Sequence, residues 1–288
     1  MEPSLESFTL PEKSIAVKRE NGHLHFEVSH YESRGRALES LLHTAASEGV
    51  GDFDWILFSL ADKPLSLDRS LEIQESIPYY QPCTSDLTDY SKTYPDYFFQ
   101  SCENYGIDDY EHYRIKLMAA GFKNPTTQAL GWLGALTSDV RRKFVEHAKT
   151  VGKDNIFYRS VEWNSEFNAV PPHKYMSMLE QSSLFKYLID MEGVGYTPRL
   201  KLQFFSFRPI FIVDRPWKEF FFEHLVPWVH YVPVKSDLSD LSENINRLDE
   251  DAKLYKYIRN NMSQFSQDYL TRAAAVKRLR DILLSHTR

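Results

Sequence analysis

The sequence predicts an α/β protein with a doubly wound, largely parallel sheet. Strand-like and helix-like segments alternate along the chain, and no internal repeat or low-complexity tract interrupts them. The 288 residues suit two domains, at about 100–200 residues per domain. Hydrophobic residues make up 42% of the chain, which is enough to bury a sizeable core.

The first half contains three clear elements. Alternating apolar residues predict a strand over residues 24–28, helical spacing predicts a helix over 35–46, and a continuous apolar run predicts a buried strand over 55–60. Residues 78–113 are acidic and rich in tyrosine, with few periodic signals. We interpret them as long loops near a cleft, interrupted by a helix or two.

A new α/β unit begins near residue 125. Its pattern predicts a strand over 129–133, a turn at Gly134, a helix over 138–149 and a strand over 156–158. We therefore predict an N-terminal domain at 1–124 and a C-terminal domain at 125–288. The tail, residues 251–285, reads as helices.

A glycine loop at residues 193–195 follows the apolar run 185–189 and precedes helical spacing. This order predicts a strand, a turn of a size to hold phosphate, and a helix N-terminus with Thr197 as N-cap and Pro198 in the first turn. A helix start favours a pyrophosphate, and Arg199 can donate to one of its oxygens. Two glycines alone more often serve turn geometry.

Charge and cysteine usage exclude some functions. The net charge is -6 and no basic block precedes the last helix, which argues against nucleic-acid binding. The first residues lack the pattern of a secretory signal, and no apolar run is long enough to span a bilayer, so we expect a cytoplasmic protein without a membrane span. Cys83 and Cys102 lack ligand spacing and are expected to be free thiols.

The segment after the glycine loop carries a long ordered motif. Its residues are Glu219-Phe220-Phe221, Leu225, Pro227-Trp228, His230-Tyr231, Pro233-Val234 and Asp237-Leu238-Ser239. This run resembles glycosyltransferase family 90, which includes protein O-glucosyltransferases and a fungal capsule-associated xylosyltransferase. The resemblance implies a GT-B-like fold, in which two Rossmann-like domains face a cleft and the C-terminal helix crosses back to the first domain.

The resemblance also implies an activity. It predicts an inverting, metal-independent transfer of xylose or glucose from a UDP-sugar to a hydroxyl of a glycan, and we favour xylose. No cofactor is expected beyond the UDP-sugar donor. Members of the secretory pathway carry signal peptides and retrieval tails, whereas this chain ends in SHTR. Relatives without such features build bacterial or viral glycans, so a glycan acceptor and a viral or bacterial source are expected.

Asp62 is the predicted general base. It follows the apolar run 55–60, and a carboxylate at the carboxyl end of a buried strand points to the edge where α/β sheets bind ligands. The family has an N-x-x-D-x-P pattern here; Asp62 and Pro64 match it, and Ser59 replaces the asparagine. A plain strand-end turn is the alternative. The resemblance favours catalysis.

A second turn, within residues 132–141, is similar to the family's R-G-S-R-T-S-x-x-R segment. The matches are Gly134, Thr137, Ser138 and Arg141. Ala135 and Leu136 stand where the family has serine and arginine, and from spacing alone Arg141 is typical of a solvated helix charge. The predicted donor-binding residues are Gly134, Thr137, Arg141, Gly193, Val194, Gly195, Tyr196, Thr197 and Arg199.

One alternative remains open and two are disfavoured. Asp52-Phe53-Asp54 spells the DxD pattern of metal-dependent transferases, but it precedes the apolar run and so lies at the opposite end of the strand from Asp62. We therefore expect no catalytic metal. The missing serine and arginine also leave open a non-catalytic nucleotide- or glycan-binding relative. A hydrolase is disfavoured, because GxSxG, HExxH and Walker-type loops do not occur.

Overall fold

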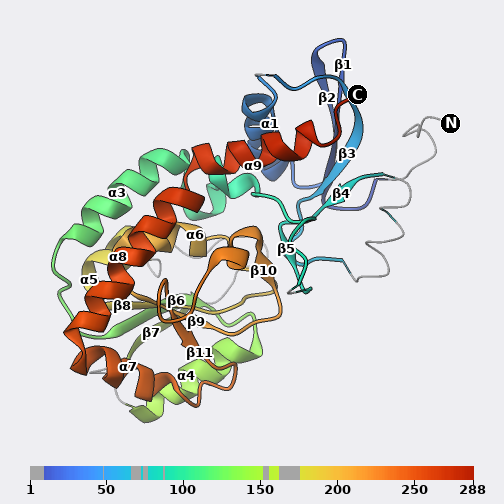
Figure 1. Cartoon of the computed structure of the whole chain (residues 1–288). Coiled ribbons are helices and arrows are strands. Elements are labelled where there is room, and N and C mark those ends of the chain that lie inside the picture. Colours follow the sequence, from blue (N-terminus) through green and yellow to red (C-terminus); the bar gives the residue numbers. More distant parts are fainter. Residues whose placement is uncertain are drawn as a thin grey trace. The chain divides into compact units, whose positions relative to one another are not determined.

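The chain forms two compact units, seen in a computed structural model (Figure 1). The first comprises Met1–Tyr110, Trp217–Glu223 and Thr271–Arg288, and the second comprises Glu111–Pro216 and His224–Leu270. The units therefore do not coincide with two continuous segments of the chain. The structure describes residues 10–47, 49–65, 73, 77–86, 88–151, 156–161 and 176–288.

The first unit contains a four-stranded sheet in the order β2-β1-β3-β4. Strand β1 (Ser14–Glu20) pairs antiparallel with β2 (His23–Ser29) and with β3 (Phe53–Ser59), and only β4 (Tyr79–Tyr80) pairs parallel, with β3. The doubly wound pattern predicted for this half is therefore not seen in its described strands.

A tight hairpin turn explains the antiparallel start of this sheet. Asn21 and Gly22 join β1 to β2 with φ angles of 52° and 79°. A two-residue turn with both φ values positive matches the twist of paired strands, and Asn-Gly is its preferred sequence. β1 was missed because its apolar residues form a short run rather than an alternation.

Helices and short segments complete the first unit. α1 (Glu32–Ala45) contacts α9 (Arg272–Leu284), and Arg280 Nε donates to the Ala45 carbonyl at 3.1 Å. The rest of the unit agrees with the long loops predicted after residue 78. Its short elements are β5 (Cys83–Thr84), β10 (Lys218–Glu219) and 3₁₀ helices at Tyr97–Phe99, Glu103–Tyr105 and Phe220–His224.

The second unit contains the predicted parallel sheet. In spatial order its five strands are β11 (Val232–Val234), β9 (Ile210–Val213), β8 (Tyr187–Asp190), β6 (Leu130–Ala135) and β7 (Ile156–Val161). All neighbours pair parallel. The chain places β7 on one side of β6 and then β8 on the other. This reversal makes the β6–β8 pair the topological switch point, where open α/β sheets bind ligands at their carboxyl ends.

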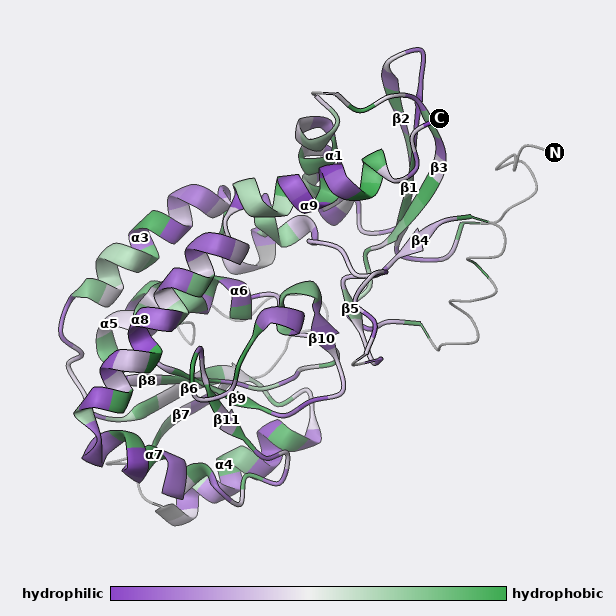
Figure 2. Ribbon diagram, viewed as in Figure 1, coloured by the Kyte–Doolittle hydropathy of each residue, from purple (hydrophilic) through white to green (hydrophobic). Residues whose placement is uncertain are grey.

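Helices cover both faces of this sheet (Figure 1). They are α3 (Tyr110–Phe122), α4 (Asp139–Val151), α5 (Met178–Leu184), α6 (Leu200–Gln203), α7 (Leu241–Glu250) and α8 (Ala252–Tyr269). Figure 2 shows hydrophobic and hydrophilic residues together along α4, as expected of a helix with one face on a core.

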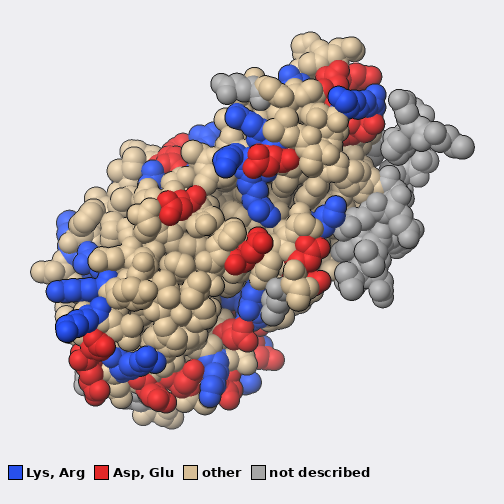
Figure 3. Space-filling model, viewed as in Figure 1, with Lys and Arg blue, Asp and Glu red and all other residues tan. Residues whose placement is uncertain are grey.

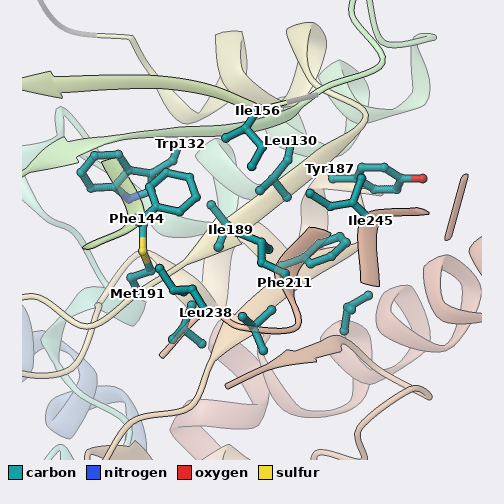
Figure 4. Close-up of a cluster of buried hydrophobic side chains, with 14 of the residues drawn as sticks. Leu130, Trp132, Phe144, Ile156, Tyr187, Ile189, Met191, Phe211, Leu238 and Ile245 are labelled. Atoms are coloured by element: carbon teal, nitrogen blue, oxygen red, sulfur yellow. The ribbon is translucent and has the colours of Figure 1, made fainter. Parts of the chain in front are cut away.

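The main core lies between the sheet and helices α4 and α7. Trp132 of β6 and Phe144 of α4 meet edge to face, with ring centroids 5.7 Å apart, and Ile189 and Phe211 from the neighbouring strands pack beside them (Figure 4). Each such side chain contributes roughly 1.5–3 kcal/mol on burial. The core therefore fixes the strands whose ends form the switch point.

The surface carries mixed charges. On the face drawn in Figure 3, Lys and Arg side chains are interspersed with Asp and Glu, and the described residues show no continuous basic surface there. Within the described ranges, the helices are all too short or too polar to cross a lipid bilayer.

Gly131→Ala is expected to destabilise the second unit by about 1–3 kcal/mol through overpacking. A Cβ at residue 131 of β6 would overlap the ring of Phe185, which is fully buried and immediately precedes the β8 region. Urea unfolding measures the change. Gly51→Ala is the matched control, because its Cβ would meet the Thr287 methyl at an ordinary 3.8 Å. Equal stability of the two variants would contradict the packing account.

Candidate active site

Arg141 joins the two strands at the switch point. It lies in the first turn of α4 and is buried. Its Nη1 donates to the Ala135 carbonyl at 3.0 Å and to Thr137 Oγ1 at 3.1 Å, while Nη2 donates to the Met191 carbonyl at 3.1 Å. Because Ala135 ends β6 and Met191 follows β8, one guanidinium holds both loops together.

The glycine loop packs directly against this guanidinium. A Cβ on Gly193 would lie 3.2 Å from Arg141 Nη2 and 3.4 Å from Thr137 Oγ1, so a larger residue would crowd the pair. Gly193 N–H donates to the Gly195 carbonyl at 3.1 Å, which closes the loop. Ser138 Oγ donates to the carbonyl of Glu192 at 2.9 Å, so the two predicted turns meet.

Gly134 does not form the predicted turn. It lies inside β6, which continues to Ala135. A Cβ there would lie 2.8 Å from a ring carbon of Trp132, so the close approach at this glycine is to a core side chain. The turn prediction was wrong because strand pairing with β7 extends two residues beyond the apolar run.

A buried ionic network lies at the end of β8. Asp190 is fully buried, and its Oδ2 accepts from Thr197 Oγ1 at 2.5 Å and pairs with Arg215 Nη1 at 2.6 Å. Arg215 Nη1 also donates to Thr197 Oγ1 at 2.8 Å, and its Nη2 donates to the Asp190 carbonyl at 3.2 Å. Since Arg215 follows β9, the network connects the ends of two strands to the glycine loop.

Arg199 is the least satisfied group in this cluster. Its side chain is 9% exposed; Nη1 donates to the Leu133 carbonyl at 2.8 Å, and Nε lies 3.8 Å from Asp190 Oδ1. Within the described residues, Nη2 has no hydrogen-bond partner. A buried charged donor without a partner costs more than the roughly 1–3 kcal/mol of a neutral one. This nitrogen therefore has a hydrogen bond left to donate.

The helix predicted after the glycine loop is shorter than expected. α6 begins at Leu200 and passes into a 3₁₀ helix at Phe204–Ser206. The N-cap prediction for Thr197 was wrong, because its hydroxyl donates to Asp190 instead. In the loop itself Val194 is 57% exposed, whereas Tyr196 is buried beneath the Lys201 ammonium, 5.3 Å from its ring centroid.

Helix α4 supplies a second positive element. Its first turn follows β6 directly, so the unpaired N–H groups of its N-terminus and its macrodipole face the carboxyl edge of the sheet. The sheet edge thus combines a helix start, a glycine loop and buried arginines. Such an arrangement can hold a diphosphate.

Asp62 lies in the first unit, in the loop after β3. Its side chain is 35% exposed, and Arg34 Nη1 donates to Oδ1 at 3.0 Å. Ser59 Oγ accepts from the Ala61 N–H at 3.2 Å, and the Ser59 carbonyl accepts from Tyr94 Oη at 2.5 Å. A polar side chain therefore orders this loop at the position where the family pattern has asparagine.

The DxD carboxylates have structural partners at the opposite end of β3. Asp52 accepts from the N–H groups of Asn21 and Gly22 at 2.8 and 3.0 Å, which holds the hairpin turn. These two hydrogen bonds lower the pKa of Asp52, and the one from Gly22 has the larger effect. Asp54 accepts from Arg288 Nε at 3.1 Å. The predicted position of this motif relative to Asp62 is confirmed.

Three residues of these clusters were missed from the sequence. Asp190 has a usable signal, because it ends an apolar strand run in the same way as Asp62. Arg215 has a similar signal, because it comes two residues after the apolar run 210–213. Arg34 has none, because it lies in an ordinary polar context and meets its carboxylate only through the fold.

Comparison with known proteins identifies the family. The profile described as glycosyl transferase family 90 matches residues 17–282. Protein O-glucosyltransferase 1 of Rattus norvegicus is 40% identical over 86 residues, 30% of this chain and 22% of the relative. O-glucosyltransferase rumi of Drosophila pseudoobscura pseudoobscura is 27% identical over 227 residues, 72% of this chain and 55% of the relative.

A viral protein shows a similarly long match. An uncharacterised protein of Invertebrate iridescent virus 3 is 26% identical over 234 residues, 72% of this chain and 21% of the relative. The matches to the rat and the viral protein each span only about a fifth of the relative's own length. The family profile covers nearly the whole chain, so this chain belongs to glycosyl transferase family 90.

Proposed function

We propose that the chain transfers a sugar from a UDP-sugar to a hydroxyl of a glycan with inversion at the anomeric carbon, and that Asp62 is the general base. The donor sugar is xylose or glucose. Glucose gains support from the relatives named as glucosyltransferases, whereas xylose rests on the resemblance to the xylosyltransferase branch. Family membership supports sugar transfer itself.

The observation that carries the donor site is the unpartnered Nη2 of Arg199 at the switch point. A departing UDP develops negative charge on its β-phosphate, and buried positive groups stabilise that charge strongly because little water competes. In the proposal, Arg199 Nη2, the N–H groups of residues 193–197 and the α4 N-terminus hold the diphosphate. Arg141 keeps the two loops in register and lies beside the same anion.

Asp62 supplies the other half of the chemistry in this proposal. Its partly exposed carboxylate takes the proton of the acceptor hydroxyl while that oxygen forms a bond to the anomeric carbon. The bond from the anomeric carbon to the β-phosphate oxygen breaks on the opposite side, and its electron pair leaves with UDP. Attack opposite to the leaving group inverts the anomeric centre.

Arg199→Met is expected to weaken UDP binding by about 10–100-fold, the value of one charge-assisted hydrogen bond in a buried site. Isothermal titration with UDP, and with UMP for comparison, measures the loss. UMP affinity should fall less, because UMP lacks the β-phosphate. Lys143→Met is the control, since it removes an exposed positive charge near the N-terminal end of α4, which the proposal places at the diphosphate.

Unchanged UDP affinity in Arg199→Met would contradict the donor site.

A separate measurement addresses catalysis. The wild-type chain is expected to release UDP from UDP-xylose or UDP-glucose, at least by slow hydrolysis with water as the acceptor. UDP binding without any release from either donor would favour the non-catalytic nucleotide-binding relative.

A further inference from the structure

Arg34 holds the proposed base through a single nitrogen. Its Nη1 donates to the Leu60 carbonyl at 2.7 Å and to Asp62 Oδ1 at 3.0 Å. The carboxylate is thereby fixed relative to the residue that directly follows β3. Within the described part of the chain, Arg34 is the only hydrogen-bond donor to Asp62, so Oδ2 has no protein partner there.

The guanidinium of Arg34 also contacts two aromatic rings. Its Cζ lies 4.2 Å from the ring centroid of Tyr31 and 5.0 Å from that of Tyr97. Burial raises the pKa of Tyr97, which keeps this ring neutral at physiological pH. Two cation–π contacts and two donated hydrogen bonds leave the guanidinium little freedom, and its side chain is 15% exposed.

The backbone before α1 places one of these rings. His30 and Tyr31 have φ angles of 58° and 59°, a left-handed conformation that non-glycine residues rarely adopt. Two such residues in succession persist only where surrounding contacts hold them, and they occur preferentially at functional sites. The Tyr31 carbonyl accepts from the Gly35 N–H at 2.9 Å, so the strained residue begins the helix that carries Arg34.

We infer that Arg34 is a positioning residue for sugar transfer: it holds Oδ1 of Asp62 so that Oδ2 is presented to the acceptor hydroxyl. This inference rests on the proposed function. The proton moves from the acceptor hydroxyl to Oδ2, and the acceptor oxygen bonds to the anomeric carbon as UDP departs. Arg34 remains protonated throughout and touches neither substrate.

The test is the Arg34→Ala variant, assayed by UDP release from whichever of UDP-glucose and UDP-xylose the wild type turns over faster. We expect kcat to fall about 10–100-fold, the cost of misplacing a catalytic group by about 1 Å. KM for the donor and the affinity for UDP are expected to stay unchanged. Arg36→Ala is the matched control, because Arg36 lies on the same helix with a side chain 64% exposed.

Chemical rescue separates positioning from a purely structural role. Guanidinium ions, at concentrations that leave the wild-type unfolding transition unchanged, are expected to restore part of the lost kcat by occupying the place of the missing side-chain guanidinium beside the two tyrosine rings. Urea has a similar shape without the charge and is expected to restore nothing. Arg34→Lys should retain more kcat than Arg34→Ala, because an ammonium can still reach one of the two oxygens.

The possible failures are distinguishable. Wild-type kcat in Arg34→Ala, with Asp62→Asn inactive, would overturn the inference and leave the proposed function intact. A loss of kcat that guanidinium does not restore would likewise overturn it. Full turnover by Asp62→Asn, or none by the wild type, would instead contradict the proposed function, and the inference would fall with it.

Discussion

Asp62→Asn is expected to lower the rate of sugar transfer by about 10²–10⁴-fold, the usual contribution of a general base. An amide has the shape of the carboxylate and can accept the hydrogen bond from Arg34, but it cannot take up the acceptor proton. Affinity for UDP is expected to stay at the wild-type value, because the proposal assigns the diphosphate to other residues. Steady-state UDP release and titration calorimetry measure the two quantities.

Asp54→Asn is the matched control for this variant. It changes a carboxylate of the same strand region, in the DxD motif, whose partner is the exposed Arg288. If Asp54 held a catalytic metal, its loss would abolish transfer; we expect nearly wild-type turnover. Inactivity of Asp54→Asn together with activity of Asp62→Asn would reverse the assignment of the two carboxylates.

Asp190→Ala is expected to lower the free energy of unfolding by about 3–5 kcal/mol, the cost of breaking a buried ion pair by removing one partner. Arg215 would remain buried without its carboxylate, and Thr197 would lose the acceptor that holds the glycine loop. UDP affinity is expected to fall as well, because Arg199 is oriented from the same cluster. Urea unfolding and titration with UDP measure both effects.

The chain contains a close control for this ion pair. Arg142 Nη2 and Asp139 Oδ1 are also 2.6 Å apart, but their side chains are 55% and 86% exposed. Asp139→Ala is therefore expected to leave the unfolding transition nearly unchanged, since exposed pairs are screened by water. Equal destabilisation by the two substitutions would contradict the view that burial makes the Asp190 pair important.

Replacing both partners tests the network further. In Asp190→Leu/Arg215→Met, the buried charge of Arg215 is removed together with its carboxylate, and only Arg199 still lacks Asp190, so stability is expected to recover part of the loss. UDP affinity should stay low, because Thr197 would have neither polar partner. A double variant that binds UDP like the wild type would show that the network serves stability alone.

The parallel sheet of the second unit was predictable because its strands are buried on both faces and read as apolar runs, as in 129–133 and 185–189. The sheet of the first unit was not predictable in the same way. Its hairpin carries a clear Asn21-Gly22 signal, but β1 has no alternating pattern, and only the family resemblance predicted that α9 returns to this unit from the far end of the chain. Periodicity does not reveal such long-range pairing.

The two turns at the switch point were predictable as a pair from the glycine loop and the family resemblance, and the structure brings them together through Arg141. The groups that hold these turns and the Asp62 carboxylate in place were not predictable. Asp190 meets Arg215 and Asp62 meets Arg34 across about two dozen or more intervening residues. Gly134 shows a further limit, because sequence does not tell whether a glycine turns the chain or packs against a ring.

A crystal structure of the chain with bound UDP tests the central claim most directly. We predict that the β-phosphate lies within hydrogen-bonding distance of Arg199 Nη2, at the carboxyl ends of β6 and β8. UDP bound elsewhere, with Arg199 Nη2 still lacking a partner, would contradict the account.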